Sequence, residues 1–216
     1  MQKDYTQLSI NTYFSYIDKT FNLYHEFSHA AFVTLTKNEL IKINIRKKDC
    51  SGECTFYNSK RNNLYMMLIY ISGVTSNLFY NKYISNGCDR TDIEKVVEIF
   101  NNYNNSEILS LKNKLDNTLT NIELTKNQKL IISEYVNSIN DRYLNINDFL
   151  MNKTAFHCFI ISLLEFIFKI FISINHEFYE LCKMYENRNF ITRKGSKKIV
   201  RNFEKMFYLA KVNDII

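Results

Sequence analysis

Residues that break helices are almost absent from this chain. Its 216 residues include no proline and only four glycines, whereas Ile, Leu, Lys, Asn, Phe and Tyr are abundant. Because proline and glycine are the residues that most disfavour a helix interior, the sequence predicts a mainly helical protein. A chain of this length can bury a real core, as one domain or as one domain with a helical extension.

One predicted helix, within Leu23 to Leu35, carries the motif His25-Glu-Phe-Ser-His29. Residues four apart on a helix share one face, so the two imidazoles can bind one zinc ion while Glu26 reaches the water bound to it. This pattern is typical of metallopeptidases. The alternative is that both histidines are hydrogen-bonded polar groups on a packed helix.

A small β-hairpin is predicted directly after this helix. The alternation of apolar and polar residues from Leu40 to Arg46 indicates a half-buried strand. A turn at Asp49 to Glu53 and a short strand from Cys54 to Tyr57 complete the hairpin. We expect its edge to receive a peptide substrate as an added strand, since backbone hydrogen bonds tolerate many side chains. Asp18 is predicted to cap the helix that carries the motif.

Helices are predicted over most of the remaining chain, from apolar periodicity and end signals. Their predicted bounds are Asn63 to Tyr83 (ended by Asn86-Gly87), Thr91 to Asn101, Glu107 to Thr118, Lys126 to Asn140, Ile146 to Asn187 with a break, and Lys197 to Lys211.

The segment Phe156 to Asn175 is apolar around almost its whole circumference and is long enough to span a membrane. A narrow polar stripe that includes Glu165 and Lys169 favours burial in a helical bundle or a dimer interface, because central charges are costly in lipid. We therefore expect a soluble protein, attached to a membrane at most peripherally, with a membrane-spanning Phe156 to Asn175 segment as the alternative.

The five cysteines are an odd number, and the N-terminus shows no secretory pattern. These features favour a cytoplasmic location. Cys50 and Cys54 could hold a metal ion or form a disulfide, but a turn with two incidental thiols explains them better, and we assign them no site role.

The net charge of +6 comes largely from two basic stretches, Lys42 to Lys48 and Arg193 to Lys211. No nucleic-acid-binding motif accompanies them, and the aromatic residues lie in apolar runs. We predict no nucleic-acid partner and interpret both stretches as solvated surface.

The order of four features resembles the peptidase domain of FtsH-type ATP-dependent zinc metalloproteases over about residues 20 to 105. The matching segments are Tyr24-His-Glu-Phe-Ser-His-Ala30, the strand followed by Ser51-Gly52, Tyr70-Ile-Ser-Gly-Val-Thr-Ser-Asn-Leu78 and Gly87-Cys-Asp-Arg-Thr-Asp-Ile-Glu-Lys-Val96. The resemblance implies a mainly α, zincin-like metallopeptidase domain with a small β-hairpin, residues 1–105, followed by C-terminal helices, residues 106–216, that pack on it.

The resemblance also implies the roles of single residues. His25, His29 and Asp92 would be zinc ligands, with Glu26 as the general base. Asp89 competes with Asp92 for the third position, but fits a solvated turn or a helix cap. The ligand set agrees with zinc chemistry, since two imidazoles and one carboxylate leave a fourth position for water.

Three departures from the family pattern bear on function. Ser28 replaces the glycine usual within the motif, and Asn77 stands where the family commonly has an acidic residue. No G-x-x-x-x-G-K-[ST] sequence occurs, so an ATPase would have to be a separate partner.

The sequence thus predicts a zinc endopeptidase that cleaves unfolded or flexible polypeptide segments, alone, as a homo-oligomer or with a separate ATPase. One alternative is a membrane-embedded protease of the site-2 type, which needs several spans. The other is an inactive peptidase-like domain that binds or regulates a partner.

Overall fold

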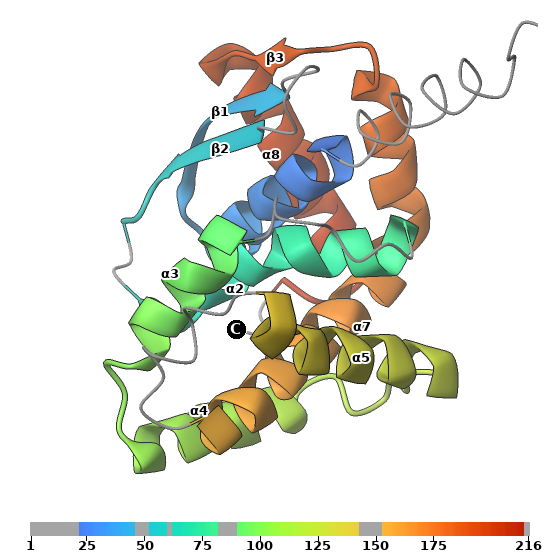
Figure 1. The fold of residues 1–216 in the computed structure, drawn as a ribbon. Coiled ribbons are helices and arrows are strands. Elements are labelled where there is room, and N and C mark those ends of the chain that lie inside the picture. Colours follow the sequence, from blue (N-terminus) through green and yellow to red (C-terminus); the bar gives the residue numbers. More distant parts are fainter. Residues whose placement is uncertain (1–21, 46–51, 60–61, 82–89, 143–152, 214–216) are drawn as a thin grey trace, which may run out of the picture.

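A helix over residues 22–35 carries the motif and lies at the centre of the protein (Figure 1). In the computed structural model the described residues are 22–45, 52–59, 62–81, 90–142 and 153–213. Every residue of this motif helix is buried, because it is covered by a sheet and by other helices. The predicted cap Asp18 lies outside the described residues.

A three-stranded antiparallel sheet follows the motif helix. The predicted hairpin is confirmed as β1 (Glu39–Ile45) and β2 (Gly52–Tyr57). A strand that the sequence analysis did not predict, β3 (Phe190–Ile191), pairs with the other side of β1, which gives the order β2-β1-β3. Among the described residues, the edge that remains open on the hairpin is therefore that of β2, because β1 is paired on both sides.

Two helices lie against the motif helix on the side of its histidines. These are α2 (Asn63–Ser76) and α3 (Arg90–Phe100), which pack on each other. The prediction of one regular helix from Asn63 to Tyr83 is wrong at its end, because the chain changes to a π-helical turn, η1 (Asn77–Asn81). Such turns are rare and often occur at functional sites. Residues 82–89, including Asn86-Gly87 and Asp89, lie outside the described residues.

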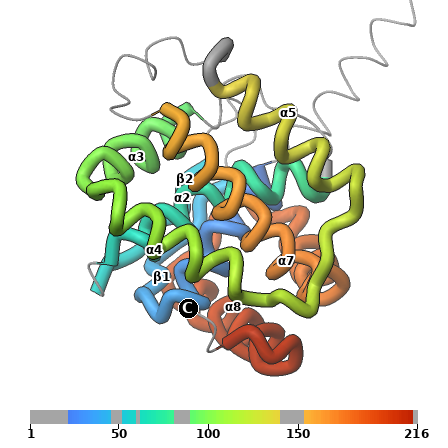
Figure 2. The backbone as a smooth tube through the Cα atoms, turned by 90° about the horizontal axis from the view of Figure 1, so that it is seen from below, coloured from blue at the N-terminus to red at the C-terminus, as the bar shows by residue number. Residues whose placement is uncertain are grey.

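The C-terminal half is helical, as predicted, and supplies α4 (Asn105–Asp116), α5 (Lys126–Arg142), α7 (Lys153–Tyr185) and α8 (Arg193–Leu209). Figure 2 shows α4 and α5 beside α7, and both pack against it. Helix α7 also packs on α2 and α8. The break predicted within this helix is absent from its described part, and α8 begins at Arg193, before the predicted Lys197.

Helix α7 is a core helix. It is the one helix among the described residues that is long and apolar enough to cross a membrane, yet 61% of its most apolar window is buried inside the protein. Ser162 is buried, and Glu165 and Lys169 are half-buried on the predicted polar stripe. The motif helix, α2 and α7 all contribute to one continuous apolar core. Burial inside the protein therefore explains the apolar composition of α7.

We predict that Phe171→Ala lowers the free energy of unfolding by about 3–5 kcal/mol, the usual cost of removing a fully buried phenylalanine ring. Phe171 is 0% exposed and contacts the rings of Phe32, Phe79, Tyr80 and Phe178. Urea denaturation of detergent-free protein measures the loss.

Tyr208→Ala is the matched control for Phe171→Ala, because the Tyr208 side chain is 72% exposed and surface substitutions usually change stability by about 0.5 kcal/mol or less. A cost below about 1 kcal/mol for Phe171→Ala, or a protein that needs detergent to stay in solution, would contradict the burial of α7 in this core.

Candidate metal centre

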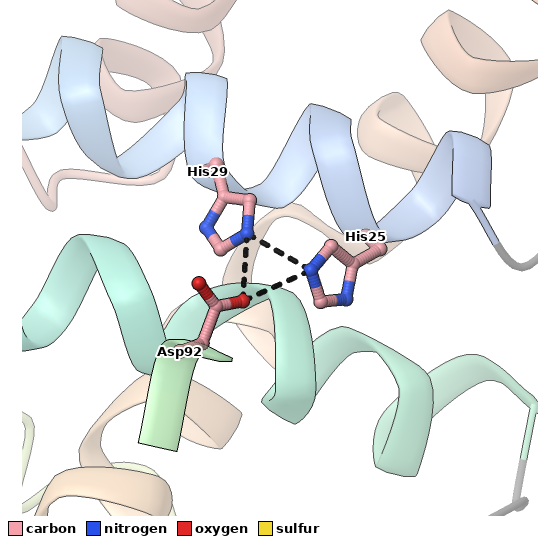
Figure 3. Close-up of side chains that lie close together, drawn as sticks. All are labelled: His25, His29 and Asp92. Carbon is pink, nitrogen blue, oxygen red and sulfur yellow. Dashed lines mark hydrogen bonds and ion pairs between the residues drawn. The ribbon is translucent and has the colours of Figure 1, made fainter. Parts of the chain in front are cut away.

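Two imidazoles meet on one face of the motif helix. His25 and His29 are one helical turn apart, and their Nε2 atoms lie 3.0 Å from each other, with the rings at 86° (Figure 3). Both side chains are almost completely buried. The four-residue spacing alone accounts for this approach, as the sequence predicted.

A carboxylate from another helix completes the group. Asp92 lies in the first turn of α3, and its Oδ2 atom is 3.1 Å from Nε2 of His25 and 3.2 Å from Nε2 of His29 (Figure 3). Helix α3 is held in place by the buried side chains Ile93, Val96, Val97 and Phe100. The structure thus brings together the three residues that were predicted as ligands.

The outer nitrogen of each ring also has a partner. Nδ1 of His29 donates to the main-chain oxygen of Ile69 at 2.6 Å, which can only accept. Nδ1 of His25 lies 3.0 Å from Nδ2 of Asn77, an amide nitrogen that donates to it; with the amide turned by 180°, the Asn77 oxygen would instead accept from an Nδ1–H, which is the tautomer that a metal at Nε2 requires. With both Nδ1 atoms protonated, the neutral rings present their Nε2 lone pairs to each other. Such outer partners orient histidine ligands at metal sites.

In that tautomer three acceptors converge without a donor among them, whereas a proton on Nε2 of His25 would hydrogen-bond this nitrogen to Oδ2 of Asp92 at 3.1 Å. In a neutral state the two Nε2 lone pairs and the Asp92 oxygen repel one another, and a cation in their midst removes this cost. Their separations of 3.0, 3.1 and 3.2 Å are close to the edge of about 3.3 to 3.4 Å that tetrahedral zinc ligands at about 2.0–2.1 Å define. The group of His25, His29 and Asp92 could hold a metal ion.

The charge of Asp92 suits this role. Burial opposes ionisation of its carboxyl, but electrostatic attraction to His29 and hydrogen bonds donated by the His25 and His29 rings hold its pKa well below its usual range. Asp92 is therefore a carboxylate at neutral pH, and it offers the negative charge that a bound cation needs.

Glu26 lies beside this group, between the two histidines in sequence. Its side chain is 4% exposed, and Oε2 has no hydrogen-bond partner among the described residues. Burial raises the pKa of Glu26, an effect that His25 and His29 partly offset. A buried carboxylate oxygen without a partner is costly, and a water or substrate group in the site would supply the missing donor.

Two glycines keep the space around these side chains open. A Cβ atom on Gly73 of α2 would lie 2.6 Å from Nε2 of both His25 and His29, and it would fill the place where their lone pairs meet. A Cβ atom on Gly52 of β2 would lie 2.0 Å from Oε1 of Glu26. Helix α2 and the β2 strand can approach the motif helix only because these residues have no side chain.

Sequence reasoning singled out these residues without finding their tasks. Gly73 appeared only within a segment that matches a family pattern, Gly52 as part of a turn and Asn77 as a departure from that pattern. The site in addition uses the carbonyl of Ile69, which no sequence signal marks. His176 and Glu180, which partly repeat the motif on α7, are both exposed and take no part in the site.

Cys54 lies on β2, half-buried and free, whereas Cys50 is outside the described residues. Burial raises the pKa of the Cys54 thiol, and the neighbouring Glu26 adds to the effect. A thiol that stays protonated is a poor metal ligand.

The sequence matches no protein-family model, and no curated protein is significantly similar to it.

We predict that Gly73→Ala abolishes high-affinity zinc binding without unfolding the protein. The added methyl group would lie 2.6 Å from Nε2 of both imidazoles, so the rings must move out of the ligand geometry, while alanine in a helix interior is itself favoured over glycine by about 1 kcal/mol. Metal analysis after dialysis and thermal denaturation of the same sample give the two results.

The control for Gly73→Ala is Thr75→Ser, a small change at a buried position two residues along α2, which should keep its zinc. Stoichiometric zinc in Gly73→Ala would mean that the metal is held elsewhere.

Proposed function

We propose that this protein is a zinc-dependent endopeptidase of zincin-like fold that hydrolyses peptide bonds in unfolded or flexible polypeptide segments. The observation that carries the proposal is the convergence of two imidazole nitrogens and a carboxylate oxygen beside a second, buried carboxylate. His25, His29 and Asp92 would hold the ion, and Glu26 would act as the general base and then as the general acid. This division of roles matches the needs of metal-assisted hydrolysis.

Bound zinc would supply a Lewis acid and a water molecule whose pKa is lowered to about 7. The protein residues would transfer the protons and orient the ligands. Glu26 accepts a proton from the attacking water at Oε2 and later donates it to the nitrogen of the leaving amine. Its burial favours this exchange, because a raised pKa brings the carboxyl closer to the pH at which the water ionises. The Ile69 carbonyl holds His29 in the tautomer that leaves Nε2 free, and Asn77 would hold His25 in the same tautomer with its amide oxygen turned toward Nδ1.

The open edge of β2 is the proposed substrate-binding element. Gly52, the first residue of β2, packs directly against the carboxyl group of Glu26, so an extended peptide paired with β2 would pass beside the general base. Backbone pairing of this kind needs no deep side-chain pocket. It also requires an extended substrate, which favours unfolded segments over folded domains. Such segments would come from damaged proteins or from a separate unfolding ATPase.

We predict that Glu26→Gln lowers the rate of peptide hydrolysis by at least about 100-fold, since general base catalysis contributes about 10²–10⁴-fold. The substitution keeps the shape of the side chain but removes its ability to take a proton. The assay follows cleavage of an unstructured protein by zinc-loaded protein, with metal content measured alongside.

Bound zinc should be unchanged in Glu26→Gln, because Glu26 is not among the proposed ligands. Normal cleavage by this variant would remove Glu26 from the mechanism, whereas inactive wild-type protein with stoichiometric zinc would refute the peptidase proposal itself.

We predict that Asp92→Ala loses most of the bound zinc and all activity, because only two imidazoles remain. Glu94→Ala on the same helix is the matched control, since Glu94 is exposed and pairs with Arg90; its zinc affinity should be unchanged. Asp89→Ala tests the competing assignment and should cost at most the 10–100-fold typical of a residue outside the ligand shell. Equal zinc in Asp92→Ala and wild-type protein would exclude Asp92 as a ligand.

We predict that a peptide bound to the Glu26→Gln variant slows hydrogen exchange at the main-chain amides of β2 (Gly52–Tyr57). The amides of α4 serve as the internal reference, because this helix lies away from the sheet (Figure 1). Slowed exchange confined to the C-terminal helices would exclude β2 as the binding edge.

A further inference from the structure

Helix α8 presents a continuous row of positive charge to solvent. Its apolar side chains Ile199, Phe203, Met206 and Phe207 are buried on one face. With about 100° between successive residues of a helix, five basic residues fall on the opposite face. We call these exposed residues the basic face of α8: Lys194, Lys197, Lys198, Arg201 and Lys205.

Glu177 and Glu180 of α7 line the same groove as Lys198 and Lys205, but the described part of the protein pairs neither lysine with them. Arg193, at the start of the helix, pairs with Glu39 of β1 at 2.7 Å, but no residue of the basic face forms an ion pair with a described carboxylate. Glu204 is the only acidic residue of α8. The basic face is therefore available to a negatively charged partner.

The arrangement does not serve the stability of the helix. The first turn of α8 has no acidic residue, and Arg193, Lys194 and Lys197 lie near the end at which the helix dipole disfavours positive charge. Basic residues at a helix end where they do not stabilise the helix are more readily explained by a binding role. An anionic partner bound to these basic residues would offset their unfavourable interaction with the helix dipole.

Apolar side chains are exposed at the other end of the same surface. Tyr208 and Leu209 at the end of α8 are 72% and 61% exposed, and Met184 of α7 is 67% exposed. Leu209 and Met184 border a groove of about 330 Å³ between α7 and α8, whose polar lining includes Glu177 and Glu180 beside Lys198 and Lys205. Basic residues beside exposed aromatic and aliphatic groups match the boundary between lipid headgroups and acyl chains.

We propose that the basic face of α8 binds the surface of an anionic lipid bilayer, with Tyr208, Leu209 and Met184 entering the headgroup region. Clusters of four to eight basic residues on a helix are sufficient for such binding. Nucleic acid is the less suitable partner, because exposed apolar side chains gain nothing against a phosphate backbone.

Docking through α8 would leave the proposed catalytic site accessible. Phe27 of the motif helix points toward α8 and contacts Phe203, whereas His25 and His29, two residues away on either side, lie on the opposite face of the motif helix. The metal group and the membrane surface would therefore be on opposite sides of the motif helix. Substrate would reach the site from the aqueous side.

The test uses the full chain and vesicles of phosphatidylcholine with and without phosphatidylglycerol, separated by sedimentation. The variant Lys197→Gln/Arg201→Gln/Lys205→Gln removes three charges from the basic face. Binding to the anionic vesicles should fall about 100-fold, since each basic residue near such a surface contributes about fivefold. Tyr208→Ser/Leu209→Ser should weaken the binding that remains when salt is raised from about 0.1 M to about 1 M, where screening shortens the Debye length from about 10 Å to about 3 Å.

The matched control is Lys114→Gln/Lys126→Gln/Lys129→Gln, which changes the net charge equally at exposed positions of α4 and α5. It should bind the vesicles within about threefold of wild-type protein, because it leaves the basic face intact. Thermal denaturation verifies that all variants are folded. Equal binding to neutral vesicles, equal loss in both triple variants, or tighter binding to duplex DNA or RNA than to anionic vesicles would each overturn the proposal.

Discussion

The convergence of two buried imidazoles and a largely buried carboxylate is the constraint around which this protein is organised. Two imidazole nitrogens and one carboxylate oxygen lie 3.0 to 3.2 Å apart. Burying such a group is costly unless a cation compensates it. The packing of α2 on α3, the first turn of α3 and the π-helical turn at Asn77 all serve to hold this arrangement.

The motif helix has different tasks on its two sides. One side carries His25, Glu26 and His29 toward α2, α3 and β2, where Gly73 and Gly52 leave room for ligands. The other side is core, with Phe27 against the aromatic rings of Tyr185 and Phe203. A helix that is buried on all sides cannot move freely, and rigid support is what a site with ångström-scale tolerances requires.

Much of this could be predicted from the sequence. Local rules were sufficient for the motif helix, the hairpin and the helical C-terminal half, because each depends on periodicity and end signals over a few residues. The position of Asp92 beside the two histidines, 67 and 63 residues earlier in the chain, was available only through a family resemblance. No periodicity places two distant segments within hydrogen-bonding distance.

The sequence could not predict contacts made by the main chain, nor the space that is left where a residue has no side chain. The Ile69 carbonyl that orients His29 is independent of side-chain identity, and the space above the imidazoles depends on how closely α2 approaches. Strand β3 has two residues, too few for a period, and is defined by its pairing with β1. The basic run near the C-terminus was interpreted as solvated surface; its concentration on one face became evident only with the packing of α8.

X-ray absorption at the zinc edge of protein loaded with one equivalent of zinc tests the metal centre most directly. The proposed site predicts two imidazole nitrogens and oxygen ligands in a four-coordinate shell at about 2.0–2.1 Å. Scattering from sulfur at about 2.3 Å, which would place zinc on cysteine, or a shell without imidazole would contradict a metal centre formed by His25, His29 and Asp92.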